Sequence, residues 1–349
     1  MARFTTRRSL FLPALAATAV LTTACSGPGG VDLGKDWKGS KTFVLAKVDG
    51  LVTVVGINPD KGRAESLAVV PQQSDDDDSV SPQIVELADG RPLLTVPRKG
   101  NKPDRRYEVS RKDHVLDGLT ADERLRRLLP GRTLVAEVAG LPDTKSAQHT
   151  TASSVLVKDP ANWTTKREVK IPGTIDLAAS DPTSDGICLA SGNKVVRADL
   201  TTGKVTPVSV PSGLDVANLA CPAGHPVTVG SSKSTGSTGS TGSLKATLTR
   251  TAAQTTVSVA GGRVDAVAST GSSLLIAVAS GDGTEILELD ATTGKELHRA
   301  RVKGVAASLD ITATSAGWLL YTEKAVTRVD PATGRAKTFD LPGTLLDTP

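Results

Sequence analysis

Four aspartates recur in one setting along the second half of the sequence, each directly after an aliphatic residue. They are Asp176, Asp215, Asp265 and Asp310. Carboxylate oxygens are ligands that hard cations such as Ca²⁺ prefer, so four of them brought together could hold such an ion or attract a basic ligand. The alternative is that each aspartate caps the first turn of its own repeating unit. In both interpretations the four aspartates occupy the same position in successive copies of a structural repeat.

Cys188 and Cys221 are the second set with distinctive chemistry, and both lie in short apolar runs. The third cysteine of the chain, Cys25, lies in a predicted lipidation motif that is described below. Thiols oxidise outside the cytoplasm, so the two remaining cysteines suggest one disulfide. Two separate buried thiols are the alternative. A catalytic cysteine is not expected, because no histidine lies in sequence reach as its partner.

Other catalytic or metal-binding patterns are not evident. The four histidines of the chain do not recur at one repeat position, which disfavours histidine metal sites and Ser/His/Asp triads, and no nucleophile-elbow motif is present. The acidic run 75–78 lacks the spaced ligands, the glycine and the closing glutamate of an EF-hand loop. We interpret this run as a solvated loop.

The first residues predict export. Arg3, Arg7 and Arg8 precede an apolar stretch over 10–21, which is the organisation of a signal peptide. This stretch is too short to span a bilayer of about 30 Å as a stable helix. We therefore expect residues 1–24 to be removed.

Residues 21–25, Leu-Thr-Thr-Ala-Cys, resemble a bacterial lipobox. The resemblance implies cleavage before Cys25 and acylation of its thiol, and several acyl chains give stable anchoring. An ordinary secretory signal that is cut elsewhere is the alternative. Residues 6–11 also resemble a twin-arginine motif, so export by the Sec or the Tat route stays open. Residues 25–39 are expected to form a flexible tether to a domain over 40–349.

The composition of the chain argues against nucleic acid as a binding partner. The formal net charge of the 349-residue chain is +4, but three arginines and no acid lie in the predicted signal peptide. The mature chain would be nearly neutral and poor in aromatic residues, so it offers little phosphate attraction or base stacking.

One turn recurs along the domain, with the pattern Asp-x-x-Thr-Gly-Lys/Arg, and predicts hairpins. It begins at Asp199, Asp290 and Asp330, with a degenerate copy at Asn58. The Asp side chain caps such a turn and glycine supplies a positive φ. The spacings fit seven units of 40–50 residues, a length typical of four-stranded propeller blades.

The four aspartates lie 20–25 residues before turns of the repeating units. The exception is Asp215, because the turn that follows it does not match the turn pattern clearly. This spacing places them on the innermost strands, around one mouth of a central channel. The end of the chain, 341–347, echoes 171–176. We therefore expect a C-terminal strand that joins the first blade and closes the ring.

The Leu-Asp-x-x-Thr-Gly-Lys turns resemble the repeats of the PQQ-like quinoprotein and YVTN/WD40-like propellers, over roughly residues 40–347. The resemblance implies an all-β propeller, with seven four-stranded blades as the expected architecture. It does not imply an activity, because propellers host many unrelated functions. The three tryptophans do not recur at one repeat position, so no quinone cofactor is expected.

Two segments depart from the repeat. Residues 98–132 are rich in Lys and Arg and are predicted to be an irregular basic insertion, with a short helix over 121–129 after a capping box. Residues 231–243 repeat Ser, Thr and Gly and are predicted to be a flexible hairpin tip in the fifth blade.

The sequence therefore predicts a lipoprotein at the outer face of the cytoplasmic membrane, whose propeller is a non-catalytic binding or scaffold module for a protein or ligand. Membrane lipid and a protein are the expected partners, and no cofactor is expected beyond a structural Ca²⁺ at the aspartates. The rival is an enzyme that uses those aspartates, either a metal-assisted lyase or lactonase or a degenerate quinoprotein-like dehydrogenase. A sensor domain is a third alternative.

Overall fold

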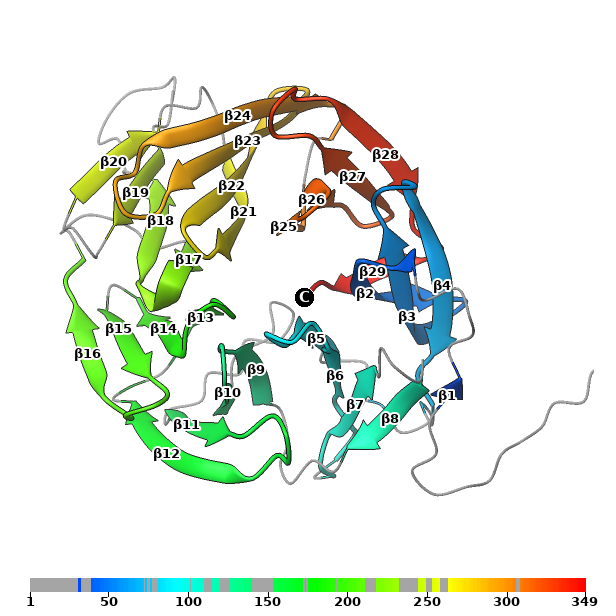
Figure 1. The fold of residues 1–349 in the computed structure, drawn as a ribbon, viewed down its shortest axis with the longest axis vertical. Helices are drawn as coiled ribbons and strands as arrows, with labels where there is room; N and C mark the ends of the chain where they lie inside the picture. Colours follow the sequence, from blue (N-terminus) through cyan, green and yellow to red (C-terminus); the bar gives the residue numbers. More distant parts are fainter. Residues whose placement is uncertain are drawn as a thin grey trace, which may run out of the picture.

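The chain folds into a ring of sheets around a central axis (Figure 1). The computed structural model describes residues 31–32, 39–71, 73, 76, 81–100, 102–109, 115–119, 126–139, 153–171, 173, 175–192, 194–210, 218–231, 244–248, 253–257, 263–305 and 308–349. The strands of these described residues form six sheets of four strands and one sheet of five. The all-β propeller is confirmed, and the expectation of four strands in every blade is wrong for the five-stranded sheet.

The first sheet contains both an early and the last strand of the chain. Its order from the axis outward is β29 (Thr344–Asp347), β2 (Thr42–Val48), β3 (Leu51–Asn58) and β4 (Arg63–Val69). Lys47 pairs with Thr344 and Leu45 with Asp347 in antiparallel register. The C-terminal strand thus closes the ring, as expected from its echo of an earlier innermost strand.

The second sheet has the fifth strand. It consists of β5 (Gln83–Glu86), β6 (Pro92–Val96), β7 (Arg105–Val109), β8 (Val115–Leu119) and β1 (Val31–Asp32). In β1, Val31 pairs with Leu116 and Asp32 with Val115. The prediction of a flexible tether over 25–39 is therefore wrong at Val31 and Asp32, which add to the outer edge of this sheet (Figure 1).

The other five sheets follow in chain order, each with its strands in sequence order from the axis outward (Figure 1). The third sheet has β9 (Arg126–Pro130), β10 (Val135–Ala139), β11 (Ser153–Lys158) and β12 (Thr165–Ile171). The fourth has β13 (Leu177–Ser180), β14 (Gly186–Ser191), β15 (Lys194–Asp199) and β16 (Val205–Val208). The fifth has β17 (Asn218–Ala220), β18 (Val227–Ser231), β19 (Leu244–Leu248) and β20 (Ala253–Val257), with a short 3₁₀ helix at Pro222–Gly224. The sixth has β21 (Arg263–Thr270), β22 (Ser273–Ser280), β23 (Gly283–Asp290) and β24 (Glu296–Lys303), and the seventh β25 (Asp310–Thr314), β26 (Gly317–Tyr321), β27 (Ala325–Val329) and β28 (Ala336–Asp340).

The segment 98–132 is not an irregular insertion, because it contains β7, β8 and the start of the third sheet. The strand pattern was hidden because charged side chains of β7 lie inside. Arg105 is 9% exposed and its Nη2 lies 3.0 Å from Oδ1 of Asp76, while Arg106 is 3% exposed and pairs with Glu137. Asp76 is itself buried, so the solvated-loop interpretation is wrong at this residue.

The helix predicted over 121–129 is also wrong where the structure describes it, because β9 begins at Arg126. Its two leucines point to opposite faces of the strand, as adjacent strand residues must. Leu128 packs against Val85 and Leu93 of the second sheet, and Leu129 packs in the core shared with the fourth sheet. Both faces are buried, so the sequence does not alternate.

The core lies between neighbouring sheets. At the junction of the first and seventh sheets, for example, Val44 and Ile57 pack with Leu319 and Tyr321. Outermost strands face solvent instead, and β12 has four exposed residues at its start. Each sheet is therefore held by its two neighbours, which makes the closed ring the stable unit. No helix among the described residues is long and apolar enough to cross a membrane.

The recurring turns have the predicted geometry. In the turn between β23 and β24, Oδ1 of Asp290 accepts hydrogen bonds from the amide and hydroxyl of Thr293 at 2.7 and 2.8 Å. Gly294 has a φ of 70° and its amide donates to the carbonyl of Asp290 at 2.8 Å. These hydrogen bonds from Thr293 lower the pKa of Asp290, which keeps the cap ionised at neutral pH.

The antiparallel order of the strands gives the ring two distinct faces, counted by strands from the axis. Face I carries the turns between first and second and between third and fourth strands. Face II carries the hairpins between second and third strands and the connections from one sheet to the next. The predicted flexible tip over 231–243 belongs to a hairpin of face II, since Ser231 pairs with Leu244; its residues 232–243 lie outside the described part.

Candidate functional site

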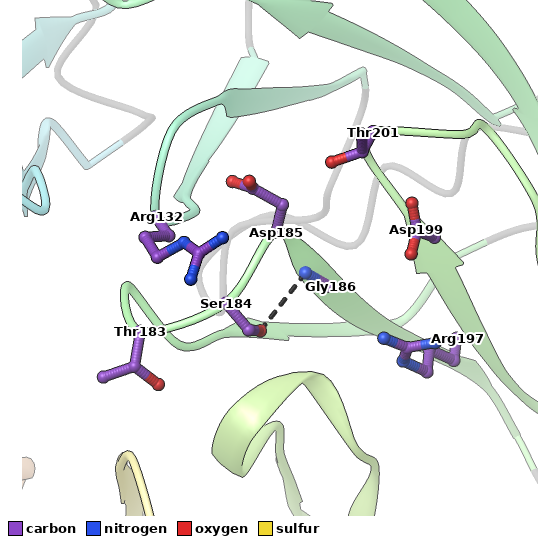
Figure 2. Close-up of a pocket in the computed structure, with 8 residues that line it drawn as sticks. All are labelled: Arg132, Thr183, Ser184, Asp185, Gly186, Arg197, Asp199 and Thr201. Atoms are coloured by element: carbon purple, nitrogen blue, oxygen red, sulfur yellow. Dashed lines mark hydrogen bonds between the residues drawn. The ribbon is translucent and has the colours of Figure 1, made fainter.

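A polar pocket of about 250 Å³ opens on face I where the third and fourth sheets meet. Figure 2 shows Arg132 and Arg197 on opposite sides of it, with Ser184, Asp185 and Gly186 between them. Its lining residues are Arg132, Thr183, Ser184, Asp185, Gly186, Arg197, Asp199 and Thr201.

Asp185 joins the two sheets beneath the pocket. Its Oδ1 accepts hydrogen bonds from the amides of Thr133 at 2.8 Å and Leu134 at 3.1 Å, and its Oδ2 accepts one from the Thr133 hydroxyl at 2.6 Å. The amide of Arg132 also donates to the carbonyl of Ser184 at 3.0 Å. The turn that carries Arg132 is thereby fixed against the turn that carries Ser184 and Asp185.

Two glycines allow the backbone to come close at the floor of the pocket. A Cβ on Gly186 would lie 2.9 Å from the Cα of Gly224, which is closer than such atoms approach. The Nε of Arg197 donates a hydrogen bond to the carbonyl of Gly224. The guanidinium on this side of the pocket is therefore oriented by the backbone of the fifth sheet.

Asp181 ties the same turn to two further sheets. It is 1% exposed, and its Oδ2 accepts hydrogen bonds from the amides of Ala223 at 2.8 Å and Gly271 at 2.9 Å. Its Oδ1 accepts from the amide of Thr183 at 2.8 Å. A buried carboxylate with three amide donors is well satisfied. Through Asp181, the turn that lines the pocket is therefore fixed to the fifth and sixth sheets.

The predicted disulfide between Cys188 and Cys221 is present in the structure, with the Cα atoms 5.6 Å apart. Cys188 lies on β14 and Cys221 directly follows β17, so the bond links the fourth and fifth sheets. Both residues are fully buried. Cys221 directly precedes the turn Pro222–Gly224, and the carbonyl of Gly224 accepts the hydrogen bond from Arg197 of the pocket.

The pocket is suited to binding an anionic group. A guanidinium pairs with carboxylate or phosphate through parallel N–H donors, and the side chain of Arg132 is exposed to solvent. Burial acts to raise the pKa of Asp199, but hydrogen bonds from Thr202 outweigh it and leave that pKa below its usual value. Asp199 therefore stays ionised and limits the pocket to ligands that also offer a donor.

Three of the four aspartates predicted at the channel are engaged with the backbone. Asp176 accepts a hydrogen bond from the amide of Gly192 at 2.9 Å, within its own sheet. Asp265 accepts from the amide of Ser308 at 3.0 Å and pairs with Arg263. Asp310 accepts from its neighbour Ile311 at 2.7 Å and from the hydroxyl of Thr348. Asp215 lies outside the described residues, as does Cys25.

The contact of Asp176 is not a cap on the first turn of its sheet, because Gly192 lies in the hairpin between the second and third strands, β14 and β15. Asp265 does not cap such a turn either, because the amide it binds belongs to the connection toward the seventh sheet. Within the described ranges, no three His, Cys, Asp or Glu side chains are placed to hold a metal ion together.

Asp347 was not singled out from the sequence, although it stands on the innermost strand of the first sheet. Its Oδ2 accepts a hydrogen bond from the amide of Ile84 at 2.7 Å, which joins the first and second sheets. Burial raises its pKa to about 7, and nearby Asp310 acts in the same direction, against the hydrogen bond from Ile84 and the charge of Arg127. The echo between 341–347 and 171–176 was the signal that could have found it.

A buried charge cluster joins the second and third sheets. The guanidinium of Arg106 pairs with Glu137, and Nζ of Lys158 lies 4.0 Å from the second oxygen of that carboxylate. The Cζ of Arg106 lies 5.9 Å from the ring centroid of Trp163. All the charged members are at most 6% exposed at their side chains, so the cluster is structural and closed to a ligand.

Comparison with known proteins supports the fold alone. No protein-family model matches the chain, and the curated proteins contain no match. Among solved structures, the WD40 domain of Pan2 from Neurospora crassa is similar, with a TM-score of 0.50, 10% identity, and 77% of this chain and 82% of that one covered. A chain of a mitotic checkpoint complex is similar at a TM-score of 0.48 and 11% identity, covering 78% and 81%. The fold is a WD40-like β-propeller.

Proposed function

We propose that the protein is an exported lipoprotein, anchored through Cys25 at the outer face of the cytoplasmic membrane, whose propeller binds a protein partner without catalysis. The observation that carries the proposal is the arginine-framed pocket on face I, where the third and fourth sheets meet. A disulfide joins the fourth of these sheets to the fifth.

The disulfide supports an extracytoplasmic location. Disulfides persist in oxidising compartments and are rare in the reducing cytosol. The Cys188–Cys221 bond links neighbouring sheets, so it stabilises the ring where the pocket lies. The signal peptide predicted over 1–24 and the lipobox-like residues before Cys25 fit the same location.

The lining of the pocket supports binding over catalysis. Its eight residues are arginines, aspartates, threonines, a serine and a glycine. The Ser184 hydroxyl accepts a hydrogen bond from the Gly186 amide at 3.2 Å, and no histidine in the lining is available to activate it as a nucleophile. An acidic side chain or chain end of a partner, with a donor group beside it, complements Arg132 and Asp199.

The anchor is tested with Cys25→Ala. The variant should leave the membrane fraction, whereas the wild-type chain should remain bound after a carbonate wash. A variant that stays membrane-bound would contradict the lipoprotein assignment.

Binding is tested by affinity purification from the protein's own membranes after gentle crosslinking, followed by native mass spectrometry. Wild-type protein and Arg335→Ala, whose exposed arginine lies on a distant turn of face I, should carry one stoichiometric protein partner. Arg132→Ala should bind it about 10-fold to 100-fold more weakly, since hydrogen bonds to charged groups contribute about 1.5–3 kcal/mol. Equal capture by both variants would contradict the pocket's role, and a bound metal or small molecule in place of a partner would contradict the binding function.

A further inference from the structure

The strand β1 defines where the chain enters the propeller. It runs antiparallel to β8, with Val31 opposite Leu116 and Asp32 opposite Val115. The beginning of β1 therefore points toward the Leu119 end of β8, and Leu119 in turn pairs with Arg106 near the start of β7. This is the end of the second sheet at which the hairpin between β6 and β7 lies, so β1 begins toward face II.

The distance from Cys25 to this point is short. Only five residues lie between Cys25 and Val31, and the six Cα–Cα steps from one to the other reach at most about 21 Å when fully extended. An acylated Cys25 lies at the bilayer surface, and β1 is paired into the second sheet. Val31, at the outer edge of the second sheet, is therefore held within about 21 Å of the lipid headgroups, whatever path those residues take.

The hairpin that the second sheet carries on face II is basic. Between Val96 and Arg105 it carries Arg98, Lys99 and Lys102, and both lysines are exposed. Its one acidic residue, Asp104, is 4% exposed. Lysines near a membrane are attracted to anionic headgroups, so this hairpin suits the surface that Cys25 would bring close to it.

Most of the exposed large aliphatic side chains of the described residues lie toward the same face. Of the four large aliphatic residues most exposed in the described part of the chain, three lie on face II and only Leu297 lies toward face I. Leu51 begins β3 after a face II hairpin and is 43% exposed, and Val69 ends β4 at 46%. Leu309 is 56% exposed in the connection before β25. The interface of a bilayer accepts such side chains together with lysines, which extend toward the headgroups.

We propose that face II is a membrane-binding surface that lies on an anionic bilayer, with the hairpin between β6 and β7 nearest to the lipid. The proposal rests on the acylation of Cys25 and adds to it a defined orientation. Face I, which carries the pocket, then points away from the bilayer toward partners.

The orientation is tested by lysine footprinting of the full lipidated protein. The protein is added to preformed vesicles of phosphatidylcholine and phosphatidylglycerol at 3:1 and treated with a membrane-impermeant acetylating reagent. The soluble Cys25→Ala chain gives the reference rates. Acetylation of Lys99 and Lys102 should slow at least fivefold on vesicles, whereas Lys204 and Lys295, which are exposed on turns of face I, should react within twofold of their reference rates.

Charge reversal provides a matched pair of variants. Lys99→Glu with Lys102→Glu should remove the protection of Lys47, a further exposed face II lysine at the end of β2. Lys204→Glu with Lys295→Glu should leave that protection intact. Both pairs change the same number of exposed charges, so a loss common to both would overturn the proposal.

The outcomes separate the two proposals. A wild-type protein whose intact mass lacks acyl chains and that does not float with vesicles would overturn the anchor and the orientation together. A protein that carries the acyl chains and floats, but whose Lys99 and Lys102 react at the reference rates, would overturn the orientation alone. Protection of Lys204 and Lys295 would show that face I is the lipid-facing side, which also overturns it.

Discussion

Replacing Asp347 with asparagine should make the propeller more stable at neutral and alkaline pH. The pKa of Asp347 is raised to about 7, first by burial and further by nearby Asp310. Between about pH 4 and 7 the folded state therefore keeps a proton that the unfolded chain has lost. The stability of the wild-type protein falls as pH rises through this window, because the folded state binds more protons. The asparagine side chain of the variant has no proton to lose, and its oxygen can still accept the hydrogen bond from the Ile84 amide.

The size of the effect follows from the shift. A change from 3.8 to about 7 spans about three pKa units, and each unit corresponds to about 1.4 kcal/mol, which sets a limit of about 4 kcal/mol. The residue is only partly buried, so solvent screens the ionised carboxylate. We expect Asp347→Asn to raise the free energy of unfolding by about 2 kcal/mol at pH 8. At pH 4.5 the gain should fall to about 1 kcal/mol, because the carboxyl is then protonated in the folded state but still mostly ionised in the unfolded chain.

Urea denaturation followed by circular dichroism at pH 4.5, 6 and 8 measures this difference. Asp340→Asn is the matched control, since that aspartate is exposed at the end of β28, and it should show no such pH dependence. An Asp347→Asn protein that is no more stable than wild type at pH 8 would refute the argument. So would a gain of equal size at pH 4.5, because it could not arise from ionisation.

Three further changes test the contacts that hold the sheets together. Replacing Cys188 and Cys221 by serine should lower the free energy of unfolding by about 3–4 kcal/mol, as expected for a loop of this length; equal urea midpoints for reduced and oxidised wild type would contradict this. Gly186→Ala should cost about 2 kcal/mol by overpacking, and unchanged thermal unfolding would show that the backbone yields at no cost. Glu137→Gln should cost about 3 kcal/mol, because it leaves the buried charge of Arg106 without its counter-ion, whereas a loss under about 1 kcal/mol would mean that the pair is solvated.

The architecture could be predicted because its signals are local. Asp290 and Gly294 specify a turn through one side chain and one backbone angle, and neither depends on distant residues. Repetition of this turn at a regular spacing then specified the ring. The pairing of the last strand with β2 could be predicted for the same reason, since its sequence repeats that of another innermost strand.

The second and third sheets were poorly predicted because their inner positions are charged. Arg106 and Glu137 can each be buried only because the opposite charge of the other compensates it. The two residues are 31 positions apart in the sequence. A strand pattern read from hydrophobicity treats each as a surface residue. The pairs become visible only when the fold places them together.

The pocket had no sequence signal of its own. Asp185 and Arg132 belong to turns of different sheets, and each is an ordinary loop residue when read alone. Gly186 resembles any strand glycine until the backbone of Gly224 lies against it. For the aspartates predicted at the channel, the sequence signal was misleading. Their regular spacing suggested a shared ligand, whereas in the structure three of them accept hydrogen bonds from separate backbone amides.

The pairing of β29 with β2 also governs the order in which the molecule can be completed. These strands are separated by almost the whole domain in sequence, and contacts of such long range form slowly because a large loop must close first. Until β29 has been synthesised, the inner edge of β2 has unpaired backbone groups, which are a template for aggregation. A ribosome-bound or partly translocated chain therefore cannot finish its first sheet. Late closure makes the emerging chain a substrate for holding chaperones, and C-terminal truncation should harm yield more than truncation of an exposed loop of similar length.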